Sequence, residues 1–225
     1  MQPTSHAFPA KSRRALADDN LQAAMGMLRR GFPARRAAAI ARLPEFEALR
    51  DEGVAIKNHV LQHIDFYLET FERNVIAAGG QVHWCRDAAE ARATVLALCR
   101  ALDAKTVTKG KSMIGEEIAI NEHLEAHGIT PVETDLGEYI VQIRHEPPSH
   151  IIAPAIHLLK EEVAESFRQT HTHLDPARPL AEASQMCDEA RQLLRPKFLA
   201  ADVGITGANF LVAETGSSLI VTNEG

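Results

Sequence analysis

The sequence is poor in cysteine, and its three cysteines, Cys85, Cys99 and Cys187, stand far apart. An odd number at wide spacings fits neither a disulfide framework nor a metal-binding knuckle. A basic excess is also missing: the formal net charge is -6, which argues against a general nucleic-acid-binding surface. No run reaches the roughly 18 apolar residues of a membrane span, and residues 1–14 lack the apolar region of a signal peptide. We therefore expect a cytoplasmic protein without a transmembrane segment and without a metal held by this chain.

Several motifs of nucleotide and hydrolase chemistry are absent as well. Gly110-Lys111-Ser112 resembles the end of a P-loop, but that motif needs a glycine where this chain has Lys105. The sequence has no G-x-G-x-x-G, no G-x-S-x-G and no Cys-x-x-Cys. The pair His59 and His63 lacks the glutamate of a zinc-protease helix, so we interpret both as surface or helix-flank histidines, and His171 and His173 in a polar loop likewise.

The N-terminal third of the chain has helical patterning. Residues 1–14 contain prolines and serines and are expected to form a flexible arm, and residues 15–80 a helical region. A helix over 15–30 should end at Gly31 and Pro33. From Pro44 to Ala78 one apolar stripe persists at steps of three, four and seven, which predicts a single helix on the order of 50 Å long. Such a helix is longer than one compact domain can cover, so we expect it to pack on a second copy or another subunit.

From residue 81 to residue 225 the pattern changes to α/β. Strands are predicted over 81–85, 105–109 and 129–134, with helices over 88–102 and 113–127 between them. Short connections between alternating strands and helices indicate parallel crossovers. Asp135 should cap a short helix, with Glu138 reaching back as a capping box. Two further helices are expected to begin at Pro154 and near Pro179.

Polar turns follow three of the predicted strands. Lys109, Lys111 and Ser112 stand between a strand and a helix, where backbone amides and added positive charge favour an anion. Ligands of open α/β sheets gather at the carboxyl ends of parallel strands. The residues expected to meet at that edge and bind a ligand are Lys109, Lys111, Ser112, Thr134, Asp135, Thr206 and Gly207. Solvated lysines at a strand end are the alternative interpretation.

The last stretch, residues 200–225, alternates β-type runs with glycines. Its turn residues Asn209, Glu214, Thr215 and Gly216 are typical of a binding-site rim. The alternative is a tight hairpin in which the run from Phe210 pairs with the run from Ser218 and the turn has no further role.

Four stretches resemble the lactate-utilisation protein B family of iron–sulfur proteins. They are Lys-Gly-Lys-Ser-Met-Ile-Gly-Glu-Glu-Ile-Ala-Ile-Asn-Glu (109–122), Val-Glu-Thr-Asp-Leu-Gly-Glu-Tyr-Ile-Val-Gln (132–142), Pro-Pro-Ser-His-Ile-Ile-Ala-Pro-Ala-Ile-His (147–157) and Ala-Asp-Val-Gly-Ile-Thr-Gly-Ala-Asn-Phe-Leu-Val-Ala-Glu-Thr-Gly-Ser (201–217). The resemblance implies a lactate-utilisation (LUD) domain over 81–225, with an α/β fold similar to the NagB/RpiA/CoA-transferase group. It also implies a part in a multi-subunit system that oxidises L-lactate to pyruvate. Members of the family continue into a region whose cysteines carry [4Fe–4S] clusters. Since this chain has no cysteine cluster, we expect it to be the N-terminal part of a longer protein, with no cofactor of its own.

Three functional hypotheses follow from these patterns. In the first, Lys109, Lys111, Thr206 and Asn209 hold a small carboxylate or phosphate, and in the empty protein a lysine of the basic turn pairs with Glu214. In the second, the resemblance to CoA transferases makes Glu214 a nucleophile that attacks an acyl-CoA, or gives an enzyme like a sugar-phosphate isomerase. In the third, the domain is a scaffold on which the other subunits of the oxidoreductase assemble.

Overall fold

A computed structural model describes residues 5–110, 112–150 and 153–221. The chain divides into two compact units. The first, here called the sheet unit, contains Met1–Leu28 and Cys85–Gly207. The second, the hairpin unit, contains Arg29–Trp84 and Ala208–Gly225. The division falls inside one helix, α2, and each unit is described by itself.

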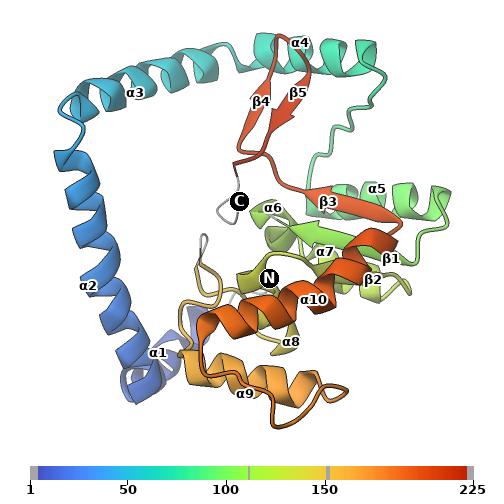
Figure 1. Ribbon diagram of the computed structural model, residues 1–225. Helices are drawn as coiled ribbons and strands as arrows, with labels where there is room; N and C mark the ends of the chain where they lie inside the picture. Colours follow the sequence, from blue (N-terminus) through green and yellow to red (C-terminus); the bar gives the residue numbers. More distant parts are fainter. Residues whose placement is uncertain (1–4, 111, 151–152, 222–225) are drawn as a thin grey trace. The chain divides into compact units, whose positions relative to one another are not determined.

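The sheet unit is built on three parallel strands in the order β2-β1-β3 (Figure 1). They are β1 (Thr106–Gly110), β2 (Thr130–Glu133) and β3 (Val203–Thr206). Threonine, valine and isoleucine dominate them, since branched side chains pack well on a pleated surface. The predicted α/β class with a parallel sheet is confirmed.

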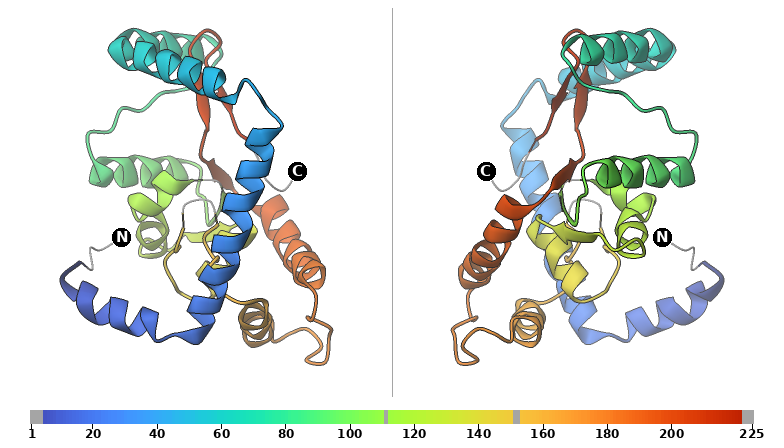
Figure 2. Two further views of the ribbon diagram at one scale, coloured as in Figure 1. Left: turned by 90° about the vertical axis from the view of Figure 1, so that its left-hand side faces the viewer. Right: turned by 90° about the vertical axis from the view of Figure 1, so that its right-hand side faces the viewer.

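Helices cover both faces of this sheet. In Figure 2, α5 and α7 lie on one side of the strands and α9 and α10 on the other. One apolar core joins α5 and α7 to Val107 of β1, and a second joins α8, α9 and α10 to Val132 of β2. The helical elements of the unit are η1 (Ser5–Ala7), α1 (Phe8–Leu16), α5 (Ala88–Ala101), α6 (Met113–Glu117), α7 (Ile120–Glu125), α8 (Leu136–Ile143), α9 (Lys160–Thr170) and α10 (Ala183–Ala200).

The hairpin unit pairs α4 (Ile64–Ala77) with the antiparallel strands β4 (Phe210–Val212) and β5 (Ser217–Leu219). The Asn74 side chain donates to the carbonyls of Ala213 and Glu214 at 2.8 and 3.0 Å, which holds the turn against α4. Gly216 has φ 68°, and a Cβ there would lie 2.5 Å from the backbone nitrogen of Val75, so the turn requires glycine. The predicted pairing of the run from Phe210 with the run from Ser218 is thus confirmed.

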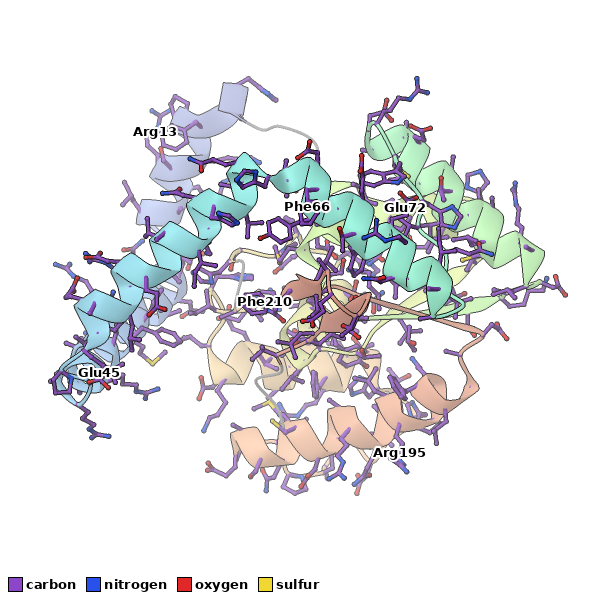
Figure 3. All side chains as sticks on the ribbon, turned by 90° about the horizontal axis from the view of Figure 1, so that it is seen from above. Arg13, Glu45, Phe66, Glu72, Arg195 and Phe210 are labelled. Carbon is purple, nitrogen blue, oxygen red and sulfur yellow. The ribbon has the colours of Figure 1, made fainter. Side chains whose placement is uncertain are left out.

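Apolar side chains of the hairpin unit remain exposed. Phe66 on α4 and Phe210 on β4 are labelled in Figure 3, and they are 62% and 59% exposed. The unit also contains α3 (Phe46–Gln62) and the C-terminal part of α2 (Asp19–Ala41).

Three predictions about the helical region are wrong in detail. Residues 8–16 form α1 instead of a loose arm. Helix α2 continues through Gly31 and Pro33, because the alanine-rich segment that follows favours helix strongly enough to offset the hydrogen bond that proline removes. The single helix over 44–78 is two helices, separated at His63, whose backbone (φ -125°, ψ 32°) leaves the helical region.

Four predictions in the α/β part also need correction. Residues 81–85 form no strand, and the two neighbours of β1 are β2 and β3. The helix over 113–127 is divided into α6 and α7 by Ala119, whose φ is 55°. The helix expected from Pro154 begins at Lys160. Asp135 does cap α8, by accepting from the Gly137 amide at 3.1 Å, but Glu138 lines a cavity instead of completing a capping box.

Candidate functional site

The predicted meeting of three strand ends is confirmed within the sheet unit. Gly110 pairs in register with Thr206, and the Gly207 amide donates to the Gly110 carbonyl at 3.4 Å. On the other side of β1, the amide and the hydroxyl of Thr134 both donate to the Lys109 carbonyl, at 2.8 and 3.0 Å. The carboxyl ends of the three strands therefore form one edge, which also carries Ser112 and Asp135. Whether that edge binds an anion stays a prediction.

The other predicted site residues are not among the described residues of the sheet unit. Asn209, Glu214, Thr215 and Gly216 belong to the hairpin unit, and Lys111 lies outside the described residues. Glu214 is exposed in the β4–β5 turn, and its carbonyl accepts from Asn74. The proposed nucleophile thus stands in a solvent-facing turn.

Lys109 is buried in an ionic cluster at the end of β1. It follows Val107 by two residues, so strand alternation turns both side chains to the same face of the sheet. The parallel register places Glu133 of β2 beside it. Its Nζ lies 2.8 Å from Glu133 Oε1 and 2.6 Å from Glu116 Oε1, and its side chain is 1% exposed. These carboxylates balance the charge of the ammonium. The partners of Lys109 are therefore Glu116 and Glu133, and not Glu214 as predicted from the sequence.

The titration of this pair follows from burial and charge. Burial by itself lowers the pKa of Lys109, but the charges of Glu133 and Glu116 and their hydrogen bonds outweigh it and raise that pKa, so the ammonium stays charged. Burial raises the pKa of Glu133 in spite of Lys109 and of the Asn121 amide, which donates to Oε1 at 2.6 Å. The other oxygen, Glu133 Oε2, has no hydrogen-bond partner among the described residues.

A cavity of about 420 Å³ opens beside this cluster. Glu138, in the first turn of α8, is 6% exposed, and its Oε2 is buried without a partner in the described part of the chain. Burial and then the charge of Glu133 raise the pKa of Glu138 to about 7, with Asp135 and Glu116 adding to the rise and Lys109 opposing it. The cavity is lined by Glu116, Asn121, Glu122, Glu125, Glu133, Glu138, Val141, Gln142, His145, Glu146, Pro147 and Pro148.

The backbone at Gly115 and at Ala119 allows the residues of the cluster to approach one another. The Ser112 hydroxyl caps α6 by accepting from the Gly115 amide at 3.0 Å. A Cβ on Gly115 would lie 3.2 Å from Lys109 Cδ and 3.1 Å from Ser112 Oγ, so glycine lets α6 lie against the lysine stem. Ala119, in the left-handed region, then turns the chain so that Asn121 reaches β2.

Sequence reasoning missed the carboxylates and the amide of this site, Glu116, Asn121, Glu133 and Glu138. One signal was available: Lys109 and Glu133 stand at the carboxyl ends of two neighbouring predicted strands and carry opposite charges. Aligning those ends in parallel would have placed them side by side.

A second buried ionic cluster lies on the other face of the sheet unit. His171 flanks the end of α9, as one of the two expected positions, but its side chain is 3% exposed and therefore not at the surface. Its Nε2 lies 2.7 Å from the Tyr139 hydroxyl and its Nδ1 2.6 Å from Glu189 Oε1. Arg178 donates to both oxygens of Glu189, at 2.6 and 2.8 Å. The hydrogen bonds from Arg178, ahead of that from His171, outweigh burial and lower the pKa of Glu189. This cluster ties α8, α9 and α10 together.

The described residues contain no group of three or more histidine, cysteine, aspartate or glutamate side chains arranged to hold a metal ion. Among them there is also no helix long and apolar enough to cross a membrane.

Comparison with known proteins matches residues 68–225 to the family model described as LUD domain. The chain is 41% identical over 220 residues to "Lactate utilization protein B" of Bacillus velezensis, which covers 97% of this chain and 45% of that protein. It is 39% identical over 226 residues to the protein of the same name from Bacillus subtilis, covering 100% of this chain and 46% of the relative. The Geobacillus kaustophilus protein of that name is 41% identical over 220 residues, covering 97% of this chain and 45% of that relative. The chain thus spans about half the length of these curated relatives. No solved structure matches it.

Proposed function

The chain belongs to the LUD-domain family, and from that premise we propose that it works in lactate utilisation, as the N-terminal part of an iron–sulfur subunit of an L-lactate-oxidising system. The observation that carries the proposal is the similarity of nearly the whole chain, at about 40% identity, to proteins named for lactate utilisation.

The [4Fe–4S] clusters of the proposal belong to a part of the protein beyond this chain. The cysteines here do not fit such a group: Cys99 is buried, Cys85 and Cys187 are exposed, and they stand far apart in the sequence. No electron-transfer step is therefore assigned to residues of this chain.

For this chain we propose ligand binding at the strand-end edge of the sheet unit. The ligand proposed from the sequence is a small anion such as a carboxylate. Because Lys109 is neutralised by Glu116 and Glu133, the donors that the described residues of that edge offer an anion are hydroxyl and backbone groups. Ser112 and Thr206 are two such hydroxyl groups, and Gly207 follows directly.

Assembly with other subunits is the second part of the proposal. Helices α3 and α4 carry large apolar side chains that are about half exposed or more, which suits packing against a partner or a second copy. They are Leu49, Val54, Ile56, Leu61, Phe66 and Ile76.

Growth of a deletion strain tests the proposed role. In the organism that carries the gene, its removal should abolish growth on L-lactate as sole carbon source and leave growth on pyruvate intact. A plasmid copy of the whole gene should restore growth. Unchanged growth on L-lactate would refute the role in lactate utilisation.

A further inference from the structure

Three hydrogen-bond acceptors on the wall of the cavity lack partners. They are Glu133 Oε2, Glu138 Oε2 and Asn121 Oδ1, and no described group of the protein donates to them. Glu133 is 2% exposed and Glu138 is 6% exposed, so neither side chain is simply a solvated surface group. A buried acceptor without a donor is costly, and native proteins leave few of them. The cavity therefore contains acceptors whose hydrogen-bonding capacity no described residue of the chain uses.

The charges around the cavity are mostly negative. Six glutamates line it, while Lys109 is paired with Glu116 and Glu133, and Arg144 is paired with Glu146. A concave site lined by one sign of charge concentrates ions of the opposite sign. The cavity thus favours a cation and repels a carboxylate or phosphate.

The size of the cavity and the arrangement of its described side chains fit an organic cation better than a bare metal ion. A volume of about 420 Å³ lies in the range of small-molecule sites. The described carboxylates and histidines include no group that could hold a metal ion. An alkylammonium group, in contrast, carries three N–H donors and a positive charge, which matches three acceptors in an acidic wall.

We propose that this cavity binds a small organic cation through a primary ammonium group, which donates to Glu133, Glu138 and Asn121. The inference goes beyond the proposed role in lactate utilisation, because it concerns a ligand of the opposite charge, bound in the cavity beside the Lys109 cluster. It does not depend on that role.

Binding of such a cation should release a proton. Glu138 has a pKa of about 7, so at neutral pH about half of the molecules carry a carboxylic acid there, and the cation favours the ionised form. Affinity should therefore rise about tenfold between pH 6 and pH 8. The charged groups that face Glu138 are Lys109 from β1, Glu133 from β2, Glu116 from α6 and Asp135 at the start of α8, with Glu122, Glu125 and Glu146 also on the cavity wall.

Isothermal titration calorimetry of the whole chain tests the proposal with matched probes. The cations are ethanolamine and 1,4-diaminobutane, and the neutral counterparts of the same shape are ethylene glycol and 1,4-butanediol. L-Lactate serves as the anionic probe, and magnesium chloride as the metal-ion probe. We expect the amines to bind and the diols, lactate and magnesium not to bind in this cavity. Titration at pH 7 in two buffers of different ionisation enthalpy should show proton release by the parent protein.

Two variants locate the site. Glu138→Gln keeps the shape of the protonated side chain and should weaken amine binding at least tenfold at pH 8 and remove its pH dependence. Glu165→Gln changes an exposed glutamate of α9 and should bind as the parent does. The proposal is overturned if no amine binds, if the diols bind equally well, or if Glu138→Gln binds the amines as the parent does. A lack of proton release by the parent would overturn it without reference to any variant.

Discussion

The sheet unit contains two buried carboxylate clusters that differ in how their oxygens are used. Glu189 is 8% exposed, and both of its oxygens accept hydrogen bonds, from Arg178 and His171. Glu133 and Glu138 are buried to a similar degree, but each has one oxygen without a donor in the described part of the chain. The pKa of Glu189 is lowered, whereas the pKa values of Glu133 and Glu138 are raised. Burial is common to the two clusters, so burial does not distinguish a ligand site from a cluster that only joins helices together.

What distinguishes them is unused hydrogen-bonding capacity beside a cavity. In a saturated cluster every acceptor already has a donor, so no hydrogen-bonding capacity remains for a ligand. Removing one member leaves the others buried without a partner, so the stability of the cluster depends on all of them. In an unsaturated cluster a buried carboxyl group lacks donors, so its ionised form is unfavourable and its pKa is shifted. Such shifted pKa values are typical of functional sites. The comparison can be sharpened by substitutions that affect stability in opposite directions.

The largest loss is expected for Arg178→Ala. This change leaves the buried Glu189 carboxylate without its main donor and should lower the free energy of unfolding by about 3–5 kcal/mol. Urea denaturation at pH 7 measures it. Arg168→Ala, which removes an exposed arginine 3.9 Å from Glu165, is the control and should cost less than about 1 kcal/mol. Equal losses in the two variants would show that the Glu189 cluster is not a structural tie.

Lys109→Met should be destabilising by a smaller and pH-dependent amount. At pH 8 the change leaves Glu133 and Glu116 without their shared cation, at a cost of about 3 kcal/mol. Because burial raises the pKa of Glu133, this carboxylate takes up a proton more readily at pH 6, so the loss should be smaller there. Adding Glu133→Gln should recover part of the stability at pH 8. A loss that is the same at both pH values, with no recovery in the double variant, would contradict the assignment of the Lys109 partners.

Glu138→Gln should act in the opposite direction. Because the pKa of Glu138 is raised in the folded state, the folded protein holds this proton more tightly than the unfolded chain. The stability contributed by the protonated form is present below the unfolded pKa and declines as the pH rises toward 7. The neutral glutamine avoids this decline, so the variant should be more stable than the parent at pH 8, by about 2–3 kcal/mol, and similar to it near pH 4. Denaturation curves over that pH range test the sign, and a destabilised variant at pH 8 would contradict it.

Tyr139→Phe should have the smallest effect. It removes the hydroxyl that lies 2.7 Å from His171 Nε2 and leaves that nitrogen buried, which costs about 1–2 kcal/mol. Thermal unfolding of this variant beside the parent measures the difference. A change as large as that of Arg178→Ala would show that the tyrosine, and not the arginine, holds the cluster.

The fold was predictable where local signals were strong. The runs of threonine and valine at 105–109 and 129–134 are strands within one or two residues, and the helix expected over 88–102 is α5, where Asp87 accepts from the Glu90 amide as the N-cap. The missed features depend on tertiary context. The β-type run at 81–85 forms no strand although its residues favour one, and Ala119 adopts φ 55° although alanine favours helix.

The candidate site was predictable only in part. The sequence indicated which strand ends converge, since that follows from topology. The neutralisation of Lys109 was indicated only for Glu133, through the aligned strand ends, and not for Glu116, which reaches the lysine from α6. Nor could the sequence identify Glu138 as the group with the raised pKa, since an unpaired oxygen is visible only when all neighbours are placed.

The contrast between the two clusters is tested most directly by carbon-13 NMR of the side-chain carboxyl groups. The whole chain labelled at glutamate Cδ would be titrated from about pH 3 to pH 9, with resonances assigned through Glu138→Gln and Glu189→Gln. We predict that Glu138 titrates with a midpoint near 7 and that Glu189 titrates below the ordinary pKa of a glutamate. A midpoint for Glu138 at or below the ordinary value, or one equal to that of Glu189, would contradict the distinction between an unsaturated ligand site and a saturated structural cluster.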